Sequence, residues 1–270
     1  AAHPRGTGTR VVLEGSEDAE LEAALLVVAD GAGSGLREQL GVAVAEESYG
    51  QHALIANVAT AEPHRGCAYE RFTDQGPLAL LPLLPAPGGE HRSALVWTLP
   101  PEQAEQLRAC PPAEFLQALQ RRFGYRLGRL QQVGERHSYP LSLVQSTEQV
   151  RQGIVVMGNA AHALHPVAGQ GYNLALRDVA ELADVLREGL SQGVAAGDLS
   201  PLQRYETRQR ADQERTIEFS HHLPALFMHA DPVLGVARDI GLAGLDVLSP
   251  LKREFVRFGA GVAGLGDWAG

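Results

Sequence analysis

The fold is decided by residues 153–190, which read GIVVMGNAAHALHPVAGQGYNLALRDVAELADVLREGL. Residues 154–157 are a short apolar run, rich in β-branched side chains, and the run ends at Gly158 and Asn159. This pattern predicts a buried strand followed by a turn. Apolar residues then recur at helical spacing, which predicts a helix over residues 174–190. The predicted apolar face consists of Leu174, Leu176, Val179, Leu182, Ala183, Val185 and Leu186.

A loop rich in glycine connects the predicted strand to the predicted helix. Gly169, Gln170 and Gly171 lie just before the helix, so backbone N–H groups are left unshielded at the positive end of the helix dipole. An ordinary strand-loop-helix crossover could have the same glycines. The preceding Gly-Asn turn and Pro166 nevertheless favour a cofactor site.

Two segments of this stretch carry a family resemblance. Residues 158–166 (GNAAHALHP) and 168–174 (AGQGYNL) closely resemble the second flavin-binding motif of the aromatic-ring flavoprotein monooxygenases, the p-hydroxybenzoate hydroxylase-like family. Many members have Gly-Asp-Ala-Ala-His, and here Asn159 stands in place of the Asp. Asn followed by Leu-His-Pro is most similar to the 2-octaprenyl-6-methoxyphenol hydroxylases of the ubiquinone pathway.

A second motif lies upstream, in residues 24–37. It resembles the Asp-Gly motif of the same family, with an apolar strand followed by Asp30, Gly31, Ser34 and Arg37 at the family's spacing. In that family the Asp lies near the ribose and pyrophosphate of the flavin, and the motif also affects use of the nicotinamide nucleotide. A carboxylate at the end of a strand can accept ribose hydroxyls, and a glycine admits a pyrophosphate closely.

The resemblance implies that FAD is the cofactor. The N–H groups of residues 169–173 would stabilise negative charge on the reduced ring, Pro166 and Val167 would shape the wall beside it, and Asn159 would bind a ribose or pyrophosphate oxygen. No residue is identified with certainty as catalytic. The predicted cofactor-binding residues are Asp30, Gly31, Ser34, Arg37, Gly158, Asn159, Pro166, Gly169, Gln170, Gly171, Tyr172 and Asn173.

The expected fold is α/β (α+β), with a partial Rossmann-like FAD-binding domain, a mainly antiparallel β-sheet substrate domain and C-terminal helices. Residues 1–45 and 146–200 are assigned to the FAD-binding domain, 46–145 to the substrate domain, and 201–270 to the helical segment. Prolines 224, 232 and 250 are expected to interrupt the last segment. Further strands are predicted at residues 11–13, 25–29, 52–60, 68–72, 78–84, 93–99 and 136–144, and further helices at 112–123 and 202–219.

The family's opening Gly-x-Gly-x-x-Gly is absent from this sequence. Counting from Gly31 the third glycine position is Leu36, and counting from Gly169 it is Leu174. We therefore expect an N-terminally truncated chain, an incomplete fragment that supplies only part of an FAD site.

Composition narrows the choice of partners and compartment. The 270 residues carry a net charge of −9 and contain no Lys/Arg-rich run, which argues against nucleic acid. No run of eighteen apolar residues is present. Cys67 and Cys110 are far apart and lack metal-type spacing, and His162 and His165 lack a third ligand, so no metal is expected. We expect a cytoplasmic protein, with peripheral contact to the inner face of the membrane as an option for the apolar C-terminal part.

The resemblance implies an FAD-dependent aromatic hydroxylase (monooxygenase) that inserts one oxygen atom of O2 into a polyprenyl phenol of ubiquinone biosynthesis. NAD(P)H would be the co-substrate. The resemblance leaves open whether the chain forms a homo-oligomer or joins a ubiquinone-biosynthesis complex. Two alternatives remain at this point: another flavoprotein oxidoreductase of the superfamily, such as a polyprenyl reductase, and a non-catalytic assembly module. The sequence does not decide the ring position, NADH against NADPH, or the oligomeric state.

Overall fold

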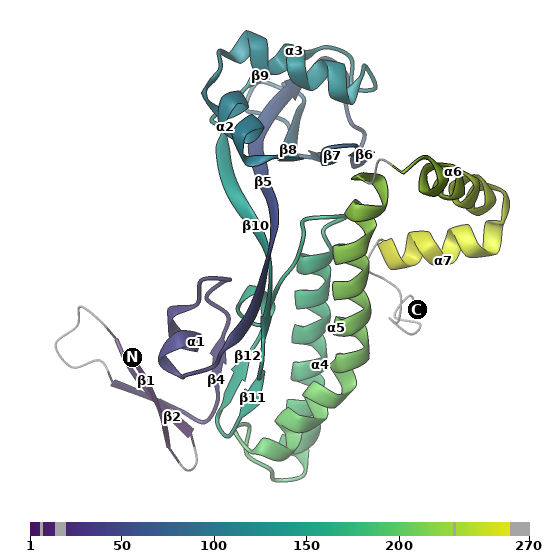
Figure 1. Ribbon diagram of the computed structural model, residues 1–270. Helices are drawn as coiled ribbons and strands as arrows, with labels where there is room; N and C mark the ends of the chain where they lie inside the picture. The colour runs from purple at the N-terminus through teal and green to yellow at the C-terminus, as the bar shows by residue number, and fades with distance from the viewer. Residues whose placement is uncertain (6–7, 14–19, 229–230, 260–270) are drawn as a thin grey trace. The chain divides into compact units, whose positions relative to one another are not determined.

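The computed structural model describes residues 1–5, 8–13, 20–228 and 231–259. The chain divides into two compact units, coloured by residue number in Figure 1. The first unit comprises Ala1–Glu47, Ser142–His221 and Glu254–Gly270, and the second comprises Ser48–Leu141 and His222–Arg253. Each unit has its own packing and is described separately.

The first unit contains a small sheet in the order β11 (Val150–Arg151), β12 (Ile154–Val156) and β4 (Leu26–Val28). Strands β12 and β4 are parallel, and Val156 lies opposite Val28. All three residues of β12 are buried, as expected for an apolar β-branched strand inside a parallel pair. Because the pair is parallel, both carboxyl ends lie at the same edge of the sheet. An antiparallel sheet of β1 (Ala2–Arg5), β2 (Gly8–Val12) and β3 (Glu20–Ala23) completes the strands near the N-terminus.

Two long helices, α4 (Gln170–Ser191) and α5 (Leu199–Met228), run side by side in the first unit, where α5 extends to His221 (Figure 1). Leu182 and Val185 of α4 pack with Leu202 and Tyr205 of α5 and with Val155 of β12. Among the described residues, the ion pairs of Arg208 in α5 reach Glu181 and Glu188 of α4.

The buried face of α4 differs from the predicted one. Leu176 and Val179 are 50% and 53% exposed, whereas Leu174 and Asp178 are fully buried. The predicted set mixed neighbouring faces, and an acidic residue at a core position concealed the true one. That face follows i, i+4 and i+3 steps through Leu174, Asp178, Leu182, Val185 and Gly189.

A larger sheet has the order β13 (His162–Ala163), β10 (His137–Ser146), β5 (Val44–Thr60), β8 (Arg92–Leu99), β7 (Gly76–Pro82) and β6 (Tyr69–Thr73). Most of it forms the second unit, whereas β13, the start of β5 and the end of β10 belong to the first unit. Strand β9 (Leu130–Val133) pairs with β5. Helices α2 (Pro101–Ala109) and α3 (Pro112–Phe123) bury one side of their surface against this sheet, and the core includes Leu54, Leu80, Trp97, Phe115 and Leu119. Helix α3 has the predicted bounds, and β1, β3, β9, β11, β13 and α2 were not predicted.

Proline placement explains where the prediction for the C-terminal part was wrong. Pro224 lies inside α5, so the carbonyl of Ser220 loses its helical donor while the helix continues. Pro232 begins α6 (Pro232–Val247), where the missing N–H costs nothing, and Asp231 caps the helix. Helix α7 (Ser249–Gly259) contains Pro250 in its first turn. Among the described residues, no helix combines the length and apolar character needed to cross a membrane.

The predicted fold class is confirmed, because the structure is a mixed α/β arrangement with a mainly antiparallel sheet and C-terminal helices. Strand β5 begins at Val44, eight residues before the predicted start, because its first part is polar and exposed.

Candidate functional site

The two sequence motifs emerge side by side from the parallel pair β4 and β12. The N–H of Met157 donates to the carbonyl oxygen of Val28 at 3.0 Å, which extends the ladder one residue beyond β12. Asp30 therefore follows one strand end and Gly158 follows the adjacent one. Ligands of open parallel sheets bind at this carboxyl edge.

The first motif is held together by its own side chains. Ser34 is the N-cap of the short helix α1 (Gly35–Gln39), and its Oγ accepts from the N–H of Arg37 at 3.0 Å. The same hydroxyl donates to Oδ1 of Asp30, while the N–H of Leu36 donates to Oδ2 at 3.4 Å. Ser34 is buried and Asp30 is exposed, so the serine orients a carboxylate that solutes can reach.

Arg37 joins the two motifs. Arg37 is only 7% exposed. Its Nη1 donates to the carbonyl oxygen of Ala160 at 2.7 Å, and its Nη2 donates to the carbonyl oxygen of Ala32 at 2.9 Å. Ala160 belongs to η1 (Gly158–Ala160), the single helical turn that follows β12. One side chain therefore fixes the Asp-Gly loop against the Gly-Asn turn.

The glycines of the site leave room for a ligand. A Cβ placed on Gly31, Gly33, Gly158, Gly169 or Gly171 would meet no atom within 4 Å. Gly31 and Gly158 also have positive φ angles of 99° and 59°, where other residues are strained. The backbone at these positions is thus open to close approach, as a pyrophosphate requires.

Helix α4 begins four residues before its predicted start. Gly169 precedes it in the left-handed conformation, and Ala168 has a positive φ of 51°, which is uncommon for a residue with a side chain. Gln170 and Asn173 donate through their N–H groups to the carbonyls of Val167 and Gly169. Gly171 and Tyr172 lie in the first turn of the helix, where backbone N–H groups lack acceptors within the helix. A helix start with unused N–H groups favours an anionic group.

The remaining predicted cofactor-binding residues differ in their exposure to solvent. Asn159 and Tyr172 are exposed, Pro166 is half-buried, and α4 packs against η1, which brings the helix start to the Gly-Asn turn. Gln170 is 1% exposed, and its Nε2 donates to the carbonyl oxygen of Gly259 at 3.0 Å. Both N–H-bearing groups of Gln170 are therefore used within the protein.

The donor set fits a flavin dinucleotide. Asp30 can accept from ribose hydroxyls, Asn159 can donate to phosphate or accept from a hydroxyl, and the N–H groups of Gly171 and Tyr172 can receive negative charge. The open glycines allow the ligand to approach the backbone. Among the described residues no cluster of three His, Cys, Asp or Glu is arranged to bind a metal ion.

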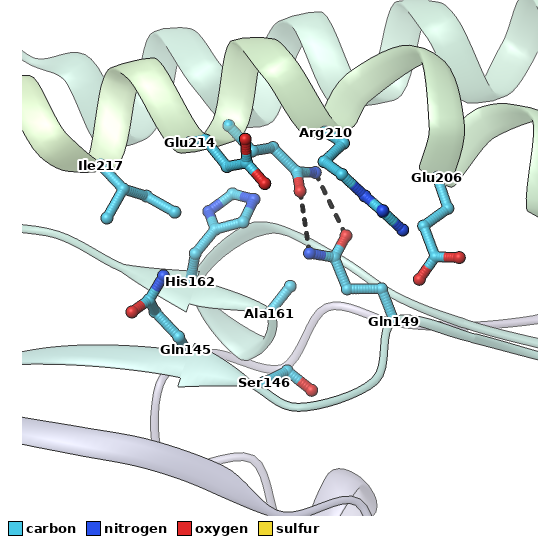
Figure 2. A pocket seen from close by; sticks show the side chains of 10 residues that line it. Gln145, Ser146, Gln149, Ala161, His162, Glu206, Arg210, Glu214 and Ile217 are labelled. Atoms are coloured by element: carbon cyan, nitrogen blue, oxygen red, sulfur yellow. Dashed lines mark hydrogen bonds between the residues drawn. The ribbon is translucent and has the colours of Figure 1, made fainter.

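A buried polar network lies behind this site, and the sequence analysis did not identify it. Nε2 of His162 contacts Oδ2 of Asp178 at 2.8 Å, and the two side chains are 2% and 0% exposed. The signal in the sequence was Asp178 itself, an acidic residue at a position that the helical period places in the core. Beside His162 lies a cavity of about 180 Å³, lined by Gln145, Ser146, Gln149, Ala161, His162, Glu206, Arg210, Gln213, Glu214 and Ile217 (Figure 2).

Residues 3–220 match the FAD binding domain family. The chain belongs to this family. It is 38% identical over 270 residues to ubiquinone hydroxylase UbiL of Rhodospirillum rubrum, covering 98% of this chain and 62% of that protein. It is 30% identical over 274 residues to 3-demethoxyubiquinol 3-hydroxylase of Escherichia coli, covering 97% and 68%. The chain thus spans less than two thirds of the first relative.

The fold is also similar to that of the Diels-Alderase PyrE3 from the biosynthetic pathway of pyrroindomycins. The TM-score is 0.71 at 23% identity, covering 98% of this chain and 55% of that chain. At this identity the likeness concerns the fold alone. The family and these relatives agree with the resemblance that the two sequence motifs indicate.

Proposed function

We propose that this chain provides the FAD site of an FAD-dependent aromatic hydroxylase. The observation that carries the proposal is the parallel pairing of β4 with β12, which brings the Asp30 and Gly158 motifs to one edge, where Arg37 joins them. The site residues keep their predicted roles. Asp30 would bind ribose hydroxyls, and Asn159 a ribose or pyrophosphate oxygen. The helix start at Gly171 would stabilise negative charge on the reduced flavin.

The reaction is the insertion of one oxygen atom of O2 into a polyprenyl phenol of ubiquinone biosynthesis, with NAD(P)H as co-substrate. FAD supplies the redox chemistry when bound, and the protein binds, orients and excludes water. The names of the two relatives, a ubiquinone hydroxylase and a demethoxyubiquinol hydroxylase, support this substrate class. Residues 1–45 and 146–200 would form the FAD-binding part, 46–145 the substrate part, and 201–270 the helical segment.

The protein is further proposed to be cytoplasmic, with peripheral contact to the inner face of the membrane. Helix α6 supports this contact, because Val233, Val236, Ile240 and Val247 lie on one face and are each more than half exposed. A homo-oligomer or a ubiquinone-biosynthesis complex would offer another cover for this face.

An activity assay tests the proposed reaction. The chain is loaded with FAD and supplied with NADH or NADPH, O2 and a short-chain prenyl phenol, and the products are analysed by mass spectrometry. The proposal predicts a product heavier by one oxygen atom, labelled when 18O2 is used. Oxidation of NAD(P)H with reduction of the substrate and no labelled oxygen would instead indicate a reductase.

A further inference from the structure

His162 and Asp178 form a buried pair inside the first unit. Because a carboxylate can only accept, Nε2 of His162 carries the proton that is shared with Oδ2 of Asp178 at 2.8 Å. Nδ1 of the ring has no hydrogen-bond partner among the described residues. The hydrogen bond to Asp178 therefore fixes the orientation of the His162 ring. In the sequence, His162 lies only three residues after Asn159 of the Gly-Asn turn.

The second oxygen of Asp178 is used as well. Oδ1 accepts from Nε2 of Gln213 at 3.0 Å, and Gln213 exchanges two amide hydrogen bonds with Gln149, at 2.9 and 3.1 Å. Figure 2 marks this exchange at Gln149. The backbone carbonyl oxygen of Gln149 accepts a hydrogen bond from the backbone N–H of Val156, the last residue of β12. The network thus links the strand before the site, the loop after it, and both long helices.

Helices α4 and α5 are also joined by contacts outside this network. One residue earlier, Arg177 donates through Nε to Asp212 at 2.6 Å and through Nη2 to Thr216 at 3.1 Å. An apolar residue at position 178 would pack between Leu174 and Leu182 without the cost of burying a carboxylate. Among the described residues, the Arg177–Asp212 pair makes no hydrogen bond to His162, so the link to this ring depends on Asp178.

The pair also lies close to the open helix start. Asp178 is about two turns into α4, and residues 163–169 run from His162 to the N–H groups of Gly171 and Tyr172. The loop has Gly169 and Ala168 in the left-handed region, so its path depends on contacts outside its own backbone. The backbone of His162 and Ala163 pairs with Gln145 and Val144 of β10 and holds the beginning of the loop. The ring of His162 links this point to Asp178, and α4 carries the other end of the loop.

We propose that His162 and Asp178 are positioning residues that fix the loop of residues 163–169 relative to α4 and so set the position of the flavin-binding N–H groups. This inference rests on the proposed FAD site for its functional consequence. Its structural part, the hold that Asp178 exerts on the loop, concerns the protein without any ligand.

The test compares two substitutions of similar size on neighbouring links. Asp178→Asn places a donor opposite Gln213 and weakens the charge-assisted bond to His162. Asp212→Asn weakens the Arg177 link between the same helices and leaves His162 untouched. Amide hydrogen exchange is measured by mass spectrometry on peptides covering residues 163–173 in the absence of FAD. We expect exchange about tenfold faster or more for Asp178→Asn, and wild-type exchange there for Asp212→Asn.

FAD binding gives the second readout, through flavin fluorescence and the shape of the flavin absorbance bands. Asp178→Asn is expected to weaken binding about tenfold and to change the bands, whereas Asp212→Asn leaves both as in the wild type. Should Asp178→Asn fail to fold, His162→Gln removes the ring from the other side of the pair and must give the same local exchange. Equal exchange of residues 163–173 in both Asp variants would overturn the inference. Absence of FAD binding by the wild type would count against the proposed function and leave the exchange comparison decisive.

Discussion

Nη1 of Arg37 donates to the carbonyl oxygen of Ala160 at 2.7 Å across 123 positions of the sequence. Arg37 belongs to the Asp30 motif, which follows β4, and Ala160 belongs to the Gly158 motif, which follows β12. The hydrogen bond therefore fixes two loops that the sheet alone would only bring near each other. A cofactor bound across both loops depends on this distance.

Arg37→Lys is predicted to loosen the junction of the motifs. Lysine is a point donor and cannot serve the carbonyls of Ala160 and Ala32 with the fork that arginine provides. The free energy of unfolding should fall by about 1.5–3 kcal/mol, with FAD binding weakened about tenfold. Urea unfolding and a flavin titration check both. Arg121→Lys, an exposed position of α3, is the control and should leave both values unchanged; a loss of the same size there would contradict the account.

Asn159→Asp is predicted to change FAD affinity modestly. Asparagine can donate to a phosphate oxygen, whereas aspartate can only accept and adds a negative charge beside a pyrophosphate. We expect an effect of about two- to tenfold on the dissociation constant, measured by fluorescence titration, with a stronger effect at low salt. An unchanged dissociation constant would mean that the side chain of Asn159 points away from the cofactor.

Gly171→Ala separates binding from stability. A Cβ at this position meets no protein atom within 4 Å, and the residue lies in the first turn of α4, so the protein should be as stable as the wild type or slightly more so. The added methyl group would stand where a ligand approaches the N–H, and FAD binding should weaken about tenfold or more. Gly244→Ala in α6 is equally free of contacts and should leave binding unchanged. Thermal unfolding measures the stability of the two variants, and titration with FAD measures their affinity. Equal FAD affinities of Gly171→Ala and Gly244→Ala would contradict a contact between the start of α4 and the flavin.

Acidification is predicted to destabilise the protein through His165. Burial, and then the nearby charge of His221, lowers the pKa of His165 from 6.5 to about 4. The folded state thus keeps this ring neutral while the unfolded chain takes up a proton, so the contribution to stability is present above pH 6.5 and is lost as the pH falls toward 4. At pH 5 the loss is about 2 kcal/mol. Urea unfolding measures the free energy of unfolding at pH 7 and at pH 5. The drop in this free energy between the two pH values should be about 2 kcal/mol smaller for His165→Gln than for the wild type. An equal drop in both proteins would contradict the role given to His165.

Local sequence patterns predicted those elements whose signals lie within the element itself. Helix α3 begins at Pro112 in a position that suits proline and buries Phe115 and Leu119 on one face, so its bounds followed from spacing alone. The start of α4 did not, because Gly169 in the left-handed region begins a helix that glycines would ordinarily end. Pro224 similarly lies within α5, although proline locally disfavours a helix.

The candidate site was predictable as two motifs, and its internal contacts were not. The resemblance of the Asp30 and Gly158 motifs to a flavoprotein family implied a dinucleotide, and the parallel pairing placed the two motifs together. Nothing local showed that Arg37 would bond to the carbonyl of Ala160, or that Ser34 would cap α1 instead of facing a ligand. His162 was considered only as a metal ligand, since its partner Asp178 lies sixteen residues away on another element.

The most direct test of the account is a titration of this chain with FAD, followed by flavin fluorescence and absorbance. We predict saturable FAD binding at one site, with a shifted flavin spectrum. Gly171→Ala should weaken this binding, and Gly244→Ala should not. A flavin signal that never saturates, or that both variants leave unchanged, would contradict the claim that the Asp30 and Gly158 motifs form an FAD site.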